Sequence, residues 1–205
     1  MPLSRPEYRK LLELRKQQTG IEVKEPDRPI ALLAPTIRKY DKALNPFADL
    51  KAGGFDRSDS CSYDVLWSDH PLATGGDAKG DIPADLLSAQ IVVTDYSSIV
   101  YEAYLLGKMV LFYAPDIAYY RTSPGLNVDP EEKCPSLVAH TEDELNSKLS
   151  IWLAHPEEYP WGEMERFVGS AFEGSGSNPA EDIAAFIYQA YPGLCGRLEA
   201  AEASA

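Results

Sequence analysis

The sequence is poor in cysteine, in long apolar runs and in positive charge. Its 205 residues include three cysteines, Cys61, Cys134 and Cys195, which do not form the C-x-x-C spacing of a zinc or redox site. An odd number of widely spaced cysteines predicts reduced thiols rather than a disulfide framework. No stretch reaches the roughly 18 consecutive apolar residues of a membrane span, and the first residues lack the apolar segment of a signal peptide. These absences predict a soluble cytoplasmic protein.

The shortage of basic residues excludes a class of partners. A formal net charge of -13 disfavours nucleic acid, which needs a basic surface, so any phosphate has to be captured locally. The exception is the segment 5–24, which carries six lysines and arginines against three glutamates. Two interpretations of this segment stay open: a solvated helix face, or a surface that docks on a partner or on the inner membrane surface.

The distribution of apolar residues predicts one α/β domain. Residues 1–25 are expected to form an amino-terminal helix and linker, 26–195 the domain, and 196–205 a flexible tail. Continuous apolar runs predict buried strands at 30–34, 63–67, 91–94 and 109–113, with a weaker one at 136–139. Helical spacing predicts helices at 6–19, 83–88, 98–107, 141–155, 159–168 and 179–191, and a helix-like segment at 41–54 that Pro46 interrupts. Strands that alternate with helices predict a parallel sheet with helices on both faces.

The loop Asp95-Tyr96-Ser97-Ser98 follows one of these strands and opens the next helix. In open α/β sheets, ligands bind beyond the carboxyl ends of the strands. Serine hydroxyls and the free N–H groups of a first helical turn can hold an anion such as a phosphate. The alternative is that Asp95 or Ser97 only caps the helix. The residues alone leave both interpretations open.

Three other strand ends stand out: Ala114-Pro115-Asp116, and two that carry candidate site residues. His70 follows the second strand and can donate to a phosphate oxygen or move a proton, although a lone histidine is often structural. Thr36 and Arg38 follow the first strand, where a nucleotide phosphate needs a cation. The alternative for Arg38 is a solvated pair with Lys39.

A glycine- and serine-rich segment gives a further candidate. Ser175 and Ser177 lie just before a helix expected to begin at Asn178-Pro179. Their backbone N–H groups could bind a diphosphate, and the alternative is an ordinary Gly-Ser linker.

Residues 84–114 resemble the signature of the CDP-glycerol glycerophosphotransferases of teichoic-acid synthesis. In that family an Asp-Tyr-Ser-Ser loop follows a strand, and a helix then leads through a leucine-x-lysine step into an apolar strand. The likeness extends to two further elements, 34–38 and 116–129, and spans about residues 30–190.

This resemblance implies the nucleotide-binding, Rossmann-like half of a GT-B glycosyltransferase. It implies that the diphosphate of CDP-glycerol rests on Ser97 and Ser98. It also implies that His70 assists the leaving phosphate and that Glu102 holds the ribose. Glycerol phosphate is then expected to pass to the end of a polyol-phosphate chain. This chemistry requires no metal and no cofactor, because helix N-termini and a histidine can stabilise the leaving nucleotide.

The chain departs from the family pattern at two places. Family members usually carry basic residues before the His-Pro pair, whereas Trp67-Ser68-Asp69 precedes His70 here. About 30 residues precede the first strand, so a second half with the acceptor site and the catalytic base is not expected within this chain. Three hypotheses follow: a donor-binding half that works with a separate acceptor-binding subunit, a non-catalytic nucleotide-binding or regulatory module, and an interaction domain whose loop only caps a helix.

Overall fold

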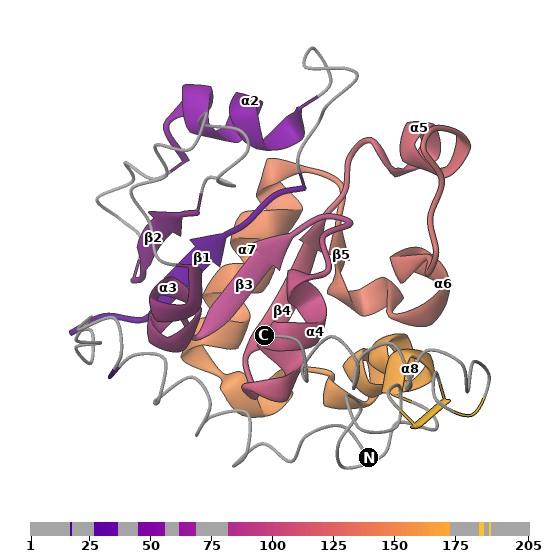
Figure 1. The fold of residues 1–205 in the computed structure, drawn as a ribbon. Helices are drawn as coiled ribbons and strands as arrows, with labels where there is room; N and C mark the ends of the chain where they lie inside the picture. Colours follow the sequence, from indigo (N-terminus) through magenta and orange to yellow (C-terminus); the bar gives the residue numbers. More distant parts are fainter. Residues whose placement is uncertain are drawn as a thin grey trace, which may run out of the picture.

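A single parallel sheet organises the molecule. The computed structural model describes residues 27–36, 45–55, 62–68 and 82–172, with the isolated positions 17, 185, 186 and 189. Five strands within these residues pair in the order β2-β1-β3-β4-β5 (Figure 1). They are β1 (Ile30–Leu33), β2 (Asp64–Trp67), β3 (Ile91–Thr94), β4 (Met109–Tyr113) and β5 (Val138–Ala139). The predicted α/β class is confirmed.

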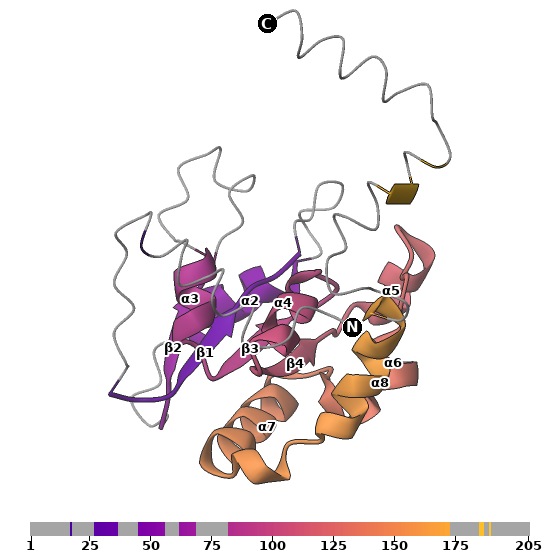
Figure 2. The ribbon, with the colours of Figure 1, turned by 60° about the horizontal axis from the view of Figure 1, so that its bottom comes forward.

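Helices connect these strands, and further helices follow the last strand along the chain. They are α2 (Pro46–Gly53), α3 (Ile82–Ser88), α4 (Ile99–Leu105), α5 (Ile117–Thr122), α6 (Pro130–Lys133), α7 (Glu142–Ala154) and α8 (Trp161–Phe172). Helix α7 lies on the opposite side of the sheet from α3 and α4 (Figure 2). The short helices α5 and α6 lie beyond the end of the sheet near β4 and β5 (Figure 1). No helix in the described part of the chain is long and apolar enough to cross a membrane.

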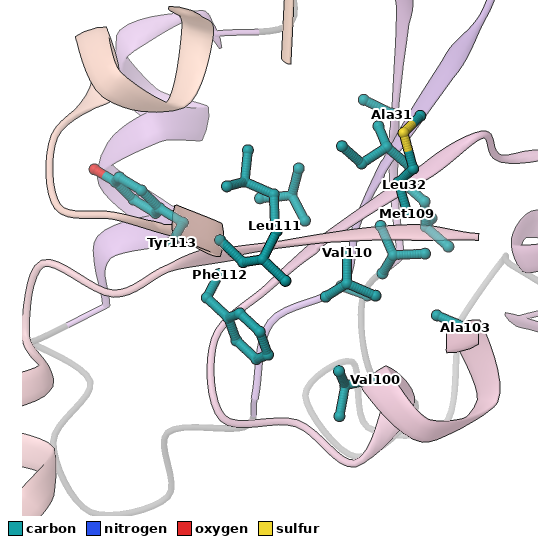
Figure 3. Packing of buried hydrophobic residues seen from close by; sticks show 14 of the residues in the cluster. Ala31, Leu32, Val100, Ala103, Met109, Val110, Leu111, Phe112 and Tyr113 are labelled. Carbon is teal, nitrogen blue, oxygen red and sulfur yellow. The ribbon is translucent and has the colours of Figure 1, made fainter. Parts of the chain in front are cut away.

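Strand β4 shows why helices cover both faces. All five of its residues are buried, and successive side chains of a strand point to opposite faces. Val110 and Phe112 point toward α4, whereas Leu111 and Tyr113 point the other way (Figure 3). The ring of Phe47 on α2 meets Tyr113 edge-on, with 5.5 Å between ring centroids. Helices α2 and α4 therefore lie on opposite faces, as the apolar strands predicted.

The strand order creates a switch point between β1 and β3. The chain leaves β1 through α2 to reach β2 on one side, and it leaves β3 through α4 to reach β4 on the other. The two connections therefore depart in opposite directions and leave a crevice at the carboxyl ends of β1 and β3. Such a crevice is where ligands bind in open α/β sheets.

Capping residues define the starts of α2 and α7. Pro46 does not interrupt a helix: it occupies the first turn of α2, and the side chain of Asn45 caps that helix by accepting the N–H of Ala48. Thr141 caps α7 by accepting the N–H of Glu144 at 3.2 Å. The carboxylate of Glu144 accepts the N–H of His140 at 2.7 Å, and this bond lowers its pKa, with a smaller effect from the N–H of Thr141. The helices predicted at 6–19 and 179–191 and the tail at 196–205 lie outside the fully described segments.

A tyrosine takes the place of a strand partner beside β4. Strand β5 pairs with β4 only at Phe112 and Tyr113. At Val110, the hydroxyl of Tyr159 accepts the backbone N–H and donates to the carbonyl, both at 2.9 Å. Burial raises the pKa of Tyr159, so this hydroxyl keeps its proton and serves as both donor and acceptor.

Candidate active site at the switch point

Hydrogen bonds fix the carboxyl ends of three strands to one another. The N–H of Ser68 donates to the carbonyl of Leu33, and the N–H of Ala34 donates to the carbonyl of Val93, both at 2.9 Å. The buried hydroxyl of Thr94 donates to the carbonyl of Ala34 at 2.7 Å. The crevice between β1 and β3 therefore has a fixed floor.

Asp95 ties the loop that follows β3 to the loop that follows β1. Its side chain is 1% exposed, and its Oδ1 accepts the N–H of Thr36 at 2.8 Å and the N–H of Tyr96 at 2.7 Å. The side chain of Asp95 therefore joins two loops across the switch point, and the N-cap residue of α4 is Ser98. The hydroxyl oxygen of Thr36 is buried and has no hydrogen-bond partner among the described residues.

The two serines open α4 without strong capping bonds. Ser98 is the N-cap residue, its side chain is exposed, and it makes no capping hydrogen bond. The hydroxyl of Ser97 accepts the N–H of Ile99 at 3.4 Å, which is long for a hydrogen bond. Neither hydroxyl is therefore held firmly by the helix that it precedes, and both can turn toward a ligand.

A cavity of about 140 Å³ lies beside these serines. It is lined by Ala34, Pro35, Ser68, Ser97, Ser98, Ile99 and Glu102. We call it the switch cavity because its walls come from the ends of β1 and β2 and from the start of α4. Glu102 lies one turn into α4 and its side chain is exposed. The structure thus brings together three predicted site residues, Ser97, Ser98 and Glu102, and Asp95 links them to Thr36.

The other predicted site residues lie outside the described part of the chain. They are His70, Arg38, Ser175 and Ser177. Their assignment stays a prediction.

Tyr96 braces the loop from the side opposite to β1. Its hydroxyl donates to Asp116 Oδ1 at 2.9 Å. Its ring stacks on Tyr120, with 3.9 Å between centroids and 28° between ring planes. The strand-end rule selects Asp116, which follows β4, as it selects Asp95, but the sequence predicted neither of these two contacts.

A second cavity of about 220 Å³ lies on the Tyr96 side of the loop. It also includes Ser97 and Ser98, and its far wall is formed by residues 125–128. An ion pair holds that wall: Arg121 contacts Asp129 through two hydrogen bonds and also pairs with Glu131. The hydrogen bond from Arg121 lowers the pKa of Asp129, and backbone N–H groups add to this effect. Sequence reasoning did not predict this cavity.

The fold and the site define the class of protein. The described residues form a doubly wound parallel sheet with a switch cavity beside a serine loop at a helix start, which is the Rossmann-like architecture found in one half of a GT-B fold. Solved structures of the wall teichoic acid polymerase TagF share this fold. One matches with a TM-score of 0.56 at 17% identity, covering 91% of this chain and 48% of the TagF chain. A TagF variant soaked with CDPG matches with a TM-score of 0.55.

The chain belongs to the CDP-Glycerol:Poly(glycerophosphate) glycerophosphotransferase family, whose pattern matches residues 3–189. A curated relative is the teichoic acid poly(ribitol-phosphate) polymerase of Bacillus spizizenii (strain ATCC 23059 / NRRL B-14472 / W23). It is 25% identical over 174 residues, which cover 77% of this chain and 27% of the relative. The chain thus spans about a quarter of the curated relative and about half of the solved TagF chains.

Proposed function

We propose that this chain is the donor-binding half of an enzyme that transfers glycerol phosphate, or a related group, from CDP-glycerol to a polyol-phosphate or glycan acceptor. The nucleotide-binding unit comprises residues 26–195. The observation that carries this proposal is the switch cavity, where Ser97, Ser98 and Glu102 line one space in a member of this family. The CDPG soak of TagF supports a nucleotide-activated ligand for this fold.

The proposed roles follow the chemistry of the residues. The hydroxyls of Ser97 and Ser98 and the nearby N–H groups hold the diphosphate, and the carboxylate of Glu102 accepts from ribose hydroxyls. Thr36 and Arg38 contact the donor from the β1 side, and Ser175 and Ser177 add donors to the diphosphate. His70 donates to the leaving phosphate.

The proposed reaction is a displacement at phosphorus. An acceptor hydroxyl oxygen forms a bond to the phosphorus that carries the glycerol. The bond from that phosphorus to the bridging oxygen breaks, CMP leaves with the electron pair, and a base on the acceptor side takes the hydroxyl proton. The proposed step uses no metal and no cofactor.

We propose that the acceptor side is supplied by a second half, because the chain spans about half of the solved TagF chains. The basic segment 5–24 is a candidate surface for docking that half, or for docking on the cytoplasmic membrane surface where a lipid-linked acceptor would lie.

CMP release from CDP-glycerol tests the enzymatic proposal. The full chain is assayed alone and together with candidate acceptor-binding proteins, and CMP is expected only in the productive pairing. Binding of CDP-glycerol with no CMP in any pairing would favour the second candidate, a nucleotide-binding module without turnover. The observation behind that candidate is Asp69, an acidic residue placed before His70 where the family usually carries basic residues.

A further inference from the structure

The second cavity shares the serine loop with the switch cavity. Ser97 and Ser98 line both spaces, so the loop separates two adjoining cavities rather than closing one. If a diphosphate rests on this loop, as the proposed function holds, groups at its two ends can extend to opposite sides. The nucleoside then occupies one side, and the second cavity is open to whatever is attached to the other phosphate.

The walls of the second cavity are built from fixed contacts. On one side, Tyr96 is held by its hydrogen bond to Asp116 and by its stack on Tyr120. On the other side, the ion pair between Arg121 and Asp129 closes the segment that contributes Gly125, Leu126, Asn127 and Val128. At the base, the ring of Phe167 on α8 packs on Phe112 of β4, with 4.9 Å between centroids. The cavity is therefore a feature of the packed fold.

The lining of this cavity selects a neutral ligand. Among the described residues that line it, none is a lysine, arginine or histidine, and the one ionisable carboxyl group is that of Asp95. A phosphate in the depth of the cavity would have no counter-charge and would meet a carboxylate. The charged part of a ligand therefore stays at the serine loop.

The uncharged polar groups that line the second cavity can bind the hydroxyls of a ligand. The hydroxyls of Ser97, Ser98 and Tyr120 and the amide of Asn127 can each donate and accept, as an alcohol does. Between them lie apolar surfaces of Val100, Leu126 and Val128 and several aromatic rings, which can cover the carbon skeleton of a ligand. Mixed surfaces of this kind match a polyol better than a fully apolar chain.

We propose that the second cavity binds the polyol unit next to the phosphate. Two ligands carry such a polyol: the donor, in the group that it transfers, and the acceptor, in its terminal unit. If the polyol belongs to the donor, the assignment rests on the proposed function. If the polyol belongs to the acceptor, the assignment stands by itself, because acceptor binding can be measured without a nucleotide.

Calorimetric titration of the full chain tests this proposal with three probes: CDP, CDP-glycerol and a short glycerol-phosphate oligomer. Leu126→Trp fills the cavity, and Asn127→Ala removes an exposed amide with little risk to folding. Glu132→Ala, an exposed change on α6 away from the lining, is the matched control. We expect both cavity variants to weaken one polyol ligand by about tenfold and to leave CDP affinity unchanged.

The pattern of losses distinguishes the sources. Loss confined to CDP-glycerol assigns the cavity to the donor, and loss confined to the oligomer assigns it to the acceptor. Equal affinities of wild type and both variants for the two polyol ligands would overturn the assignment. If the wild type binds neither CDP nor CDP-glycerol, the proposed donor site is overturned instead. The oligomer titration would then still show whether the second cavity binds a polyol.

Discussion

The carboxylate of Asp95 accepts the backbone N–H of Thr36 at 2.8 Å and thereby joins the ends of β3 and β1 across 59 positions of sequence. Because Asp95 is 1% exposed, this bond is sheltered from water. It holds the serine loop and the β1 loop at a fixed separation. The geometry of the switch cavity depends on that separation.

Removing this carboxylate is expected to destabilise the fold. Asp95→Ala leaves the N–H of Thr36 without its acceptor, which costs about 1–3 kcal/mol of unfolding free energy. Asp95→Asn keeps an oxygen that can accept and should lose less. Urea denaturation measures both, with Asp49→Ala on the exposed face of α2 as the control. Equal stability of Asp95→Ala and the control would show that the tie is unimportant.

Tyr96 is expected to act on binding through loop position. Tyr96→Phe keeps the stack on Tyr120 but loses the hydrogen bond to Asp116. The lost hydrogen bond contributes about 1 kcal/mol to holding the loop in its binding position. Its removal should therefore weaken CDP-glycerol binding by about fivefold in calorimetry. Tyr119→Phe, which alters a tyrosine that is 44% exposed on α5, should bind as the wild type does. If both variants bind equally well, Tyr96 does not position the loop.

Tyr159 is expected to matter for stability alone. Tyr159→Phe leaves the N–H and the carbonyl of Val110 without their partner in a buried position, at a cost of about 2–4 kcal/mol. Thermal and urea unfolding should show this loss, while CDP-glycerol affinity of the folded variant stays unchanged. A cost as small as that of Tyr119→Phe would mean that other groups satisfy Val110.

Acid should weaken the wall of the second cavity. Arg121 lowers the pKa of Asp129 in the folded state, so the pair contributes fully above the ordinary carboxyl pKa of about 4 and loses its contribution as the pH falls through the lower folded value. Asp129→Asn has no such carboxylate to protonate. The stability gap between wild type and Asp129→Asn should therefore be largest near neutral pH and shrink on acidification in urea titrations. A gap that is constant with pH would contradict this.

The strands could be predicted because buried parallel strands are continuous apolar runs, as at Ile91–Thr94 and Met109–Tyr113. Helices α5 and α6 could not, because they are short and the ion pair between Arg121 and Asp129 holds them together. The serine loop was found from its place after a strand. The hydrogen bond from Thr36 to Asp95 could not be predicted, because 59 positions separate the two residues and only the fold brings them together. The second cavity was hidden for the same reason, since its walls come from parts of the chain that only the fold brings together, within 95–101, at 112, within 120–130 and at 167.

The ligand-dependent melting temperature tests the central claim, that the serine loop holds the diphosphate of a nucleotide-activated donor, most directly. CDP-linked ligands should raise the melting temperature of the wild type, because a ligand that binds only the folded state stabilises it. Ser97→Ala with Ser98→Ala should remove most of that rise. Ser147→Ala with Ser150→Ala, two exposed serines on α7, should retain it. No rise across a panel of CDP and UDP ligands, or an equal rise in both double variants, would contradict the account.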